Sequence, residues 1–188
     1  KLKPANFIIF DLNKRLDIVE DKIYWKPESY IGQNKFNQDT FIEKFKESLK
    51  LRLESDVPVS TFLSGGLDSS SITKGLSDLG GRVNTFSVTH VDKKYDESFW
   101  INEVVERYGT NHTEIQIDQN TIDEAVTNAV NGLDEPYADP SIVPSFVLSR
   151  AISKEYKVAL SGDGGDELLG GYKRFQIALK NKSSMEDF

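Results

Sequence analysis

Apolar residues recur at two spacings in the first third of the chain, and each spacing predicts a different element. Residues 5–10 and 22–25 are short apolar runs joined by a polar connection, which predicts a small β-hairpin. From Asn37 the spacing becomes helical: Phe45 and Leu49 belong to an apolar row, and charged residues fill the other face. This stretch therefore predicts an amphipathic helix that packs on a sheet.

After residue 56, short apolar runs alternate with helical segments. The predicted strands are residues 57–63, 82–88, 113–117 and 157–161. The predicted helices run from the first strand to about Gly80 and then over residues 96–109, 121–133 and 141–154. This alternation is typical of βαβ units, so we expect an α/β fold with a parallel twisted sheet flanked by helices. In such sheets, ligands bind beyond the carboxyl ends of the strands.

The same patterns predict how some helices begin and which face they bury. Thr40 with Glu43 matches a capping box, in which the threonine is the N-cap residue, and residues 121–133 open with the same spacing. The apolar face of the helix over 96–109 carries Trp100, Val104 and Tyr108.

Composition narrows the class of protein. The 188 residues include 23 Lys and Arg against 30 Asp and Glu, a net charge of −7, with 38% hydrophobic residues and no cysteine. A soluble domain with a sizeable core follows, and disulfide scaffolds, thiolate zinc sites and a cysteine nucleophile are excluded within these residues. The acidic balance argues against a nucleic-acid partner, and no apolar stretch is long enough to span a membrane. We therefore expect a cytoplasmic location.

The turn after the first predicted strand has the chemistry of a phosphate site. Residues 64–70 read SGGLDSS, and Gly65 and Gly66 allow backbone N–H groups to converge at a helix N-terminus. The three serines can donate further hydrogen bonds to phosphate oxygens. Asp68 would repel an anion unless a cation stood between them, which suggests Mg2+. A tight turn with a capping Asp68 or Ser69 is the alternative. No Walker lysine follows, so kinase-type phosphoryl transfer is not indicated.

A second glycine-rich turn follows the last predicted strand. Residues 161–172 read SGDGGDELLGGY and carry three carboxylates, from Asp163, Asp166 and Glu167. Clustered carboxylates repel one another and share a site only with a cation, although a solvated acidic loop would give the same pattern. Because parallel strands end at one edge of the sheet, both turns belong to that edge. Asp68 and Asp166 are then placed to hold Mg2+ against a polyphosphate.

Together these residues resemble a known family. SGGLDSS is similar to the pyrophosphate-binding PP-loop of the N-type ATP pyrophosphatases, and SGDGGDELLGGY resembles the second signature of the glutamine-hydrolysing asparagine synthetases. The resemblance runs from about Asn37 to Tyr172 and implies the adenine nucleotide alpha hydrolase-like fold. The first motif alone would also fit GMP, NAD and argininosuccinate synthetases and tRNA-modifying enzymes.

The resemblance implies an AMP-forming ligase that uses ATP and Mg2+. A substrate carboxylate, the β-carboxylate of aspartate in the namesake reaction, attacks the α-phosphate and gives an acyl-adenylate and pyrophosphate. Ammonia derived from glutamine then displaces AMP to leave an amide. Related synthetases form β-lactams, cyclise peptides or amidate sugar precursors, and a non-catalytic nucleotide-binding module is a further alternative.

The resemblance also implies residue roles. The expected pyrophosphate cradle is Ser64, Gly65, Gly66, Asp68, Ser69 and Ser70. The expected adenosine pocket is Leu63 and Val88, which fit equally well as strand-core positions, and the residues expected near the ribose and α-phosphate are Ser161 and Gly162. The expected Mg2+ ligands are Asp68 and Asp166, and the expected catalytic carboxylates are Asp163 and Asp166. Asp163 stands where the family often has Glu, which leaves the identity of the activated carboxylate open.

The resemblance further implies that these residues are part of a longer enzyme. Residues 1–33 resemble the tail of a glutaminase domain whose nucleophile is an N-terminal cysteine, and residues 34–188 resemble the synthetase domain, cut before a late catalytic lysine. We expect the glutaminase domain to be a partner in the same polypeptide. A homodimer is a possible assembly. Two positions outside the motifs, His90 and His112, are expected to be structural or surface histidines. The candidates to face the substrate are Asp134, Glu135, Tyr137 and Asp139, although a loop and helix cap would fit these residues equally well.

Overall fold

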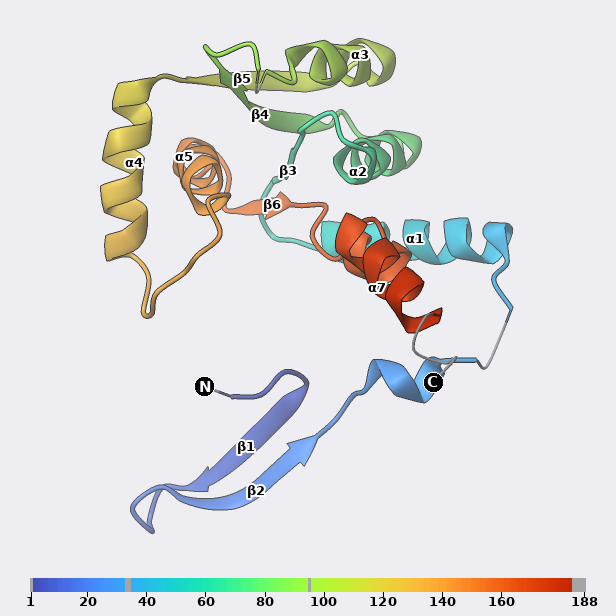
Figure 1. The fold of residues 1–188 in the computed structure, drawn as a ribbon, viewed down its shortest axis with the longest axis vertical. Helices are drawn as coiled ribbons and strands as arrows, with labels where there is room; N and C mark the ends of the chain where they lie inside the picture. Colours follow the sequence, from blue (N-terminus) through green and yellow to red (C-terminus); the bar gives the residue numbers. More distant parts are fainter. Residues whose placement is uncertain (1, 33–34, 95, 184–188) are drawn as a thin grey trace. The chain divides into compact units, whose positions relative to one another are not determined.

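The computed structural model describes residues 2–32, 35–94 and 96–183, which form two compact units (Figure 1). One unit is Lys1–Glu43 and the other is Lys44–Phe188. The compact units divide between residues 43 and 44, within a helix. The domain boundary between residues 33 and 34 stays a prediction.

The first unit contains the predicted hairpin. Strand β1 (Asn6–Asp11) pairs antiparallel with β2 (Asp17–Ile23), and a 3-10 helix, η1 (Pro27–Tyr30), follows. The second strand begins earlier than residues 22–25 because backbone pairing, and not apolar content, defines it. Its residues are mostly exposed, and charged residues separate Ile18 and Val19 from Ile23, so no continuous apolar run marks the whole strand.

The second unit is built on one four-stranded parallel sheet. Its strands are β3 (Val59–Phe62), β4 (Asn84–His90), β5 (Asn111–Ile117) and β6 (Val158–Leu160). Their order is β5-β4-β3-β6, so β3 lies between β4 and β6 although β6 comes last in the chain. The predicted α/β class with a parallel sheet is confirmed. This order also brings the carboxyl ends of β3 and β6 side by side.

Helices cover both faces of this sheet (Figure 1). The helices are α1 (Gln38–Leu53), α2 (Leu67–Asp78), α3 (Ser98–Tyr108), α4 (Gln119–Asn131), α5 (Ile142–Ile152), α6 (Gly165–Leu169) and α7 (Lys173–Ser183). The short α6 and the polar α7 were not predicted, because neither has a clear apolar period. Within the described residues, no helix is both long and apolar enough to cross a membrane.

Two apolar clusters hold the helices to the sheet. On one face, Leu49 of α1 packs with Ile72 and Leu76 of α2. On the other face, Ile117 of β5 packs with Ala125 of α4 and Val147 of α5. The sheet is therefore buried from both sides, as expected for parallel strands. Polar groups can therefore gather at the ends of the strands.

Two helix starts differ from the predicted capping boxes. The side chain of Asn37 accepts a hydrogen bond from the backbone N–H of Thr40 at 2.9 Å, and the Asp118 carboxylate accepts one from that of Thr121 at 2.8 Å. Asn37 and Asp118 are thus the residues that cap α1 and α4, and the capping boxes placed three residues later are wrong. The cause is the ambiguity of threonine, which fits both the cap and the first turn.

The predicted inward face of α3 also needs correction. Ile101 is fully buried with 0% exposure, whereas Trp100 is 61% exposed and stacks edge-on against Phe99. Val104 and Tyr108 are half-buried, as expected. Adjacent helix residues point about 100° apart around the helix axis. Because Trp100 and Ile101 are both large and apolar, the sequence does not show which of them lies at the centre of the buried face.

The orientation of α3 predicts that substitutions at two adjacent residues, Ile101 and Trp100, differ in their effect on stability. Ile101→Ala should lower the free energy of unfolding by about 2–5 kcal/mol because it leaves a cavity in the core. Trp100→Ala should cost far less, because most of that side chain already contacts solvent. Equilibrium urea denaturation of both variants measures the difference. A larger loss for Trp100→Ala would contradict the orientation of α3 described above.

Candidate functional site

The first glycine-rich turn leaves the sheet at the end of β3. Leu63 is 1% exposed, and its backbone N–H donates to the carbonyl of Phe86 in β4 at 2.8 Å. The chain then reaches the start of α2 within three residues, with Gly66 as its N-cap position. The sheet therefore fixes where the turn begins, and α2 fixes where it ends.

Serine hydroxyls organise the interior of this turn. The Ser69 hydroxyl donates to the carbonyl of Gly66 at 3.2 Å and accepts from the backbone N–H of Ser64 at 3.2 Å. The hydroxyls of Ser64 and Ser69 lie 3.1 Å apart. Ser70 differs, since its hydroxyl oxygen is buried with no hydrogen-bond partner among the described residues. The turn thus combines an internally bonded frame with one buried hydroxyl.

Gly65 is required by its conformation and by its neighbours. Its φ is +76°, in the left-handed region that favours glycine. A Cβ at this position would lie 2.6 Å from the Cβ of Trp100 and 2.9 Å from the backbone nitrogen of Ile101. The turn therefore packs directly against the first residues of α3. The sequence predicted only the backbone freedom, and nothing in it indicated this contact.

The second turn meets the first at the side chain of Asp68. A Cβ on Gly162 would lie 2.9 Å from the Cβ of Asp68, and one on Gly165 would lie 2.7 Å from its carboxylate carbon. Both glycines leave room for this half-buried aspartate. The prediction that the turns after β3 and β6 share one edge of the sheet is confirmed by these contacts.

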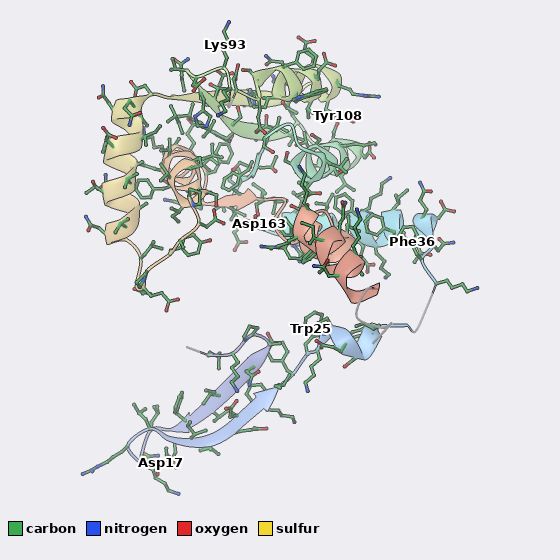
Figure 2. The ribbon with its side chains drawn as sticks, viewed as in Figure 1. Asp17, Trp25, Phe36, Lys93, Tyr108 and Asp163 are labelled. Carbon is green, nitrogen blue, oxygen red and sulfur yellow. The ribbon has the colours of Figure 1, made fainter. Side chains whose placement is uncertain are left out.

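Asp163 lies in the same second turn, between β6 and α6 (Figure 2). Its carboxylate accepts a hydrogen bond from the hydroxyl of Ser161 at 2.9 Å, and its side chain is exposed. Gly164, with φ of +92°, follows it and starts α6. Asp163 is thus oriented by a neighbouring serine and keeps its carboxylate accessible.

A cavity of about 820 Å³ opens between the two turns. That volume lies within the range of small-molecule sites. Every predicted site residue lines it except Gly65 and Ser70. The predicted residues in the lining are Leu63, Ser64, Gly66, Asp68, Ser69, Val88, Ser161, Gly162, Asp163 and Asp166. The predicted set therefore converges on one cavity from three strands.

The cavity lining also includes residues outside the predicted site, among them His90, which was expected to be a structural or surface histidine. His90 lines the cavity because β4 continues two residues beyond the predicted end at 88, which carries this side chain to the edge of the sheet. Of the four substrate-facing candidates, Tyr137 and Asp139 line it, and Asp134 and Glu135 lie outside the lining. Glu97 and Ser145, which were not predicted, lie at the start of α3 and in α5. Both lie inside predicted helices, and no local sequence signal distinguished them from other polar helix residues.

His112 lies outside this cavity lining and fits its expected structural role. Its Nδ1 is 2.8 Å from the hydroxyl of Thr85 and its Nε2 is 3.0 Å from that of Ser87, so β5 is joined to β4 through one ring. Burial lowers the pKa of His112. Both ring nitrogens are therefore used by the sheet.

The donor chemistry of the cavity fits Mg2+. Asp68 and Asp166 offer hard carboxylate oxygens from the two turns, and Mg2+ is usually held by one or two carboxylates together with phosphate oxygens and water. Within the described residues, no group of three or more acidic, histidine or cysteine side chains could hold a metal ion. The arrangement therefore suits a cation that arrives with a phosphate ligand better than a metal held by protein alone.

Comparisons with known proteins identify a matching family model and similar sequences. A family model described as asparagine synthase matches residues 40–188. A putative glutamine-hydrolyzing asparagine synthetase 2 of Methanocaldococcus jannaschii is 36% identical over 179 residues, covering 92% of this chain and 34% of that protein. Glutamine-hydrolyzing asparagine synthetase 3 of Bacillus subtilis is 35% identical over 198 residues, covering 95% and 31%. The chain thus spans about a third of the length of these relatives.

Solved structures share the fold. NH3-dependent NAD synthetase from Campylobacter jejuni aligns with a TM-score of 0.53 at 16% identity, covering 73% of this chain and 61% of that one. NMN synthetase from Francisella tularensis aligns with a TM-score of 0.51 at 14% identity, covering 75% and 61%. At these identities the likeness concerns the fold alone, and it confirms the predicted PP-loop architecture.

The packing of Gly65 leads to a matched prediction. Gly65→Ala and Gly80→Ala both place a side chain at positive φ, but only the alanine at 65 would meet other atoms. Both should lose about 1 kcal/mol from left-handed strain, and Gly65→Ala should lose a further 1–3 kcal/mol, about the usual cost of overpacking. Urea denaturation compares the two variants. Equal losses would show that the turn does not pack tightly against α3.

Proposed function

This chain belongs to the asparagine synthase family, and from that premise we propose that it is the ATP-using part of an amide-forming ligase. In this proposal a carboxylate attacks the α-phosphate of ATP, AMP stays on the acyl group, and pyrophosphate leaves. Ammonia then attacks the acyl carbon and releases AMP. The observation that carries the proposal is the meeting of the two glycine-rich turns at Asp68, beside a cavity of suitable size.

We assign pyrophosphate to the turn over residues 64–70. The N-terminus of α2 directs partial positive charge toward this turn, and the serine hydroxyls of Ser64 and Ser69 are close to its backbone. The turn holds no lysine, which suits a pyrophosphate that leaves intact better than a γ-phosphate that is transferred. Leu63 and Val88 line the same cavity and are assigned to the adenosine side. Gly65 and Ser70 stay assigned to the pyrophosphate cradle: Gly65 gives the turn its left-handed backbone, and the buried Ser70 hydroxyl has no hydrogen-bond partner among the described residues.

We assign Asp68 and Asp166 as the residues that hold Mg2+ with the nucleotide. Bound Mg2+ offsets the negative charge on pyrophosphate as it leaves. Ser161 and Gly162 are assigned to the ribose and α-phosphate, since they line the cavity directly after β6. Asp163, held by Ser161 and exposed to the cavity, is assigned to the reacting end of the substrate.

The finer proposal is that the substrate is aspartate and that glutamine supplies the ammonia. It is supported by the relatives, which are described as glutamine-hydrolyzing asparagine synthetases and are about three times longer than the matched segment. In this proposal residues 1–33 end a glutaminase domain of the same polypeptide, and residues 34–188 belong to the synthetase domain. Glutamine hydrolysis is then performed outside the residues described here.

A related amidotransferase or cyclase is the second candidate. It is favoured by one observation: Asp163 is one methylene shorter than the glutamate common at this position in the family, so its carboxylate reaches less far into the cavity. The two candidates differ in the carboxylate that triggers pyrophosphate release. The assay uses full-length protein with ATP, Mg2+ and ammonia. Under the first proposal, addition of aspartate should cause release of pyrophosphate. Under the second, aspartate should cause no release, and another carboxylate should be required.

Nucleotide binding tests the shared part of both candidates. In the full-length protein, Asp68→Asn should weaken binding of Mg2+-pyrophosphate by about 10- to 100-fold, the equivalent of losing one charge-assisted contact. Asp78→Asn is the matched control, because Asp78 lies at the other end of α2 and pairs with Lys74 at 2.7 Å. Isothermal titration measures both affinities.

Two outcomes would contradict the proposal. The first is wild-type protein that binds neither ATP nor pyrophosphate in the presence of Mg2+. The second is an Asp68→Asn variant that binds as tightly as the Asp78→Asn control. Because Asp68 is half-buried beside two glycines, thermal unfolding of each variant shows whether a loss of binding comes with a loss of structure.

A further inference from the structure

The carboxylate of Asp166 is covered by the glycine pair that ends α6. Gly170 adopts φ of +71°, and the backbone N–H of Gly171 donates to the carbonyl of Asp166 at 3.0 Å. A Cβ on Gly171 would overlap the Oδ1 of Asp166 and lie 2.9 Å from its carboxylate carbon. The backbone of this turn therefore packs directly on the carboxylate. The position of this turn therefore limits the space open to the Asp166 carboxylate.

A second interaction ties the two ends of the same turn together. The hydroxyl of Tyr172 donates to Oε1 of Glu167 at 3.0 Å, so a side-chain contact spans the turn that contains Gly170 and Gly171. The guanidinium of Arg174 lies 4.1 Å from the centre of the Tyr172 ring, within cation–π distance, and Phe175 packs edge-on against it. The ring is thus held on its faces while its hydroxyl is held by Glu167.

We propose that the Glu167–Tyr172 contact fixes the Asp166 carboxylate for the divalent cation that accompanies the nucleotide, which makes Tyr172 a positioning residue. The inference rests on the proposed function, since that function assigns Asp166 to Mg2+. Glycine is the least restricted residue, so a turn with two glycines keeps one shape only when other contacts hold it. The bond between residues 167 and 172 is such a contact, and both residues line the cavity.

The state of the tyrosine argues for positioning over proton transfer. Its hydroxyl donates its proton to a carboxylate, and the hydrogen bond to Glu167 raises the pKa of Tyr172. The hydroxyl therefore serves as a hydrogen-bond donor that spans the turn. Groups that support a metal ligand in this way typically change metal affinity by about 10- to 100-fold when removed.

The test is the affinity of full-length protein for Mn2+ in the presence of pyrophosphate, measured from the electron paramagnetic resonance signal of free Mn2+. Tyr172→Phe removes one hydroxyl and should weaken Mn2+ binding by about 10-fold. Glu167→Ala should do the same, while Glu167→Gln keeps an oxygen that accepts the hydroxyl and should stay within about threefold of wild type. Tyr156→Phe, in a ring that packs on Phe86 outside the cavity lining, is the control.

The outcomes separate this inference from the function on which it rests. If wild type binds no Mn2+-pyrophosphate, the proposed function fails. If wild type binds but Tyr172→Phe matches it, the inference is overturned and the function stands. A third outcome is a Tyr172→Phe variant that releases pyrophosphate more slowly at saturating Mg2+ but binds Mn2+ as tightly as wild type. That outcome would also overturn the inference, because it would show that Tyr172 acts on the substrate and not on the metal ligand. Thermal unfolding of Tyr172→Phe and Glu167→Ala checks that any loss is local.

Discussion

The close approach of Asp68 to Gly162 and Gly165 is the constraint on which the site depends. These residues come from turns that follow β3 and β6, which are far apart in sequence and adjacent in the sheet. A side chain on either glycine would meet Asp68, so the two turns can be this close only with glycine at both positions. The parallel sheet supplies the adjacency, and the glycines make it tight enough for two carboxylates to share one cavity.

This arrangement explains how an acidic chain can suit an anionic ligand. The net charge is −7, and four carboxylates of the two turns, from Asp68, Asp163, Asp166 and Glu167, line the cavity. Pyrophosphate and carboxylates repel unless a cation lies between them, and in low dielectric that repulsion grows. The proposed Mg2+ therefore turns the acidic lining from an obstacle into the binding surface, and each contact that orients a carboxylate affects affinity.

The sequence predicted the features that depend on local pattern. The βαβ alternation predicted the parallel sheet, and ten of the twelve predicted site residues line the cavity. It failed where alternatives differ by one residue or one turn. Trp100 and Ile101 are both large and apolar, and Thr121 fits either the N-cap or the first turn beside Asp118. Contacts such as Gly65 with α3 are long-range and have no local signal.

The most direct test of the account is a crystal structure of the full-length protein soaked with Mn2+ and pyrophosphate, in which anomalous scattering locates the metal. The account predicts Mn2+ bound by carboxylate oxygens of Asp68 and Asp166, with pyrophosphate on the turn over residues 64–70. Pyrophosphate bound away from this turn, or Mn2+ bound without either aspartate, would contradict the central claim that the turns after β3 and β6 form one metal-dependent site.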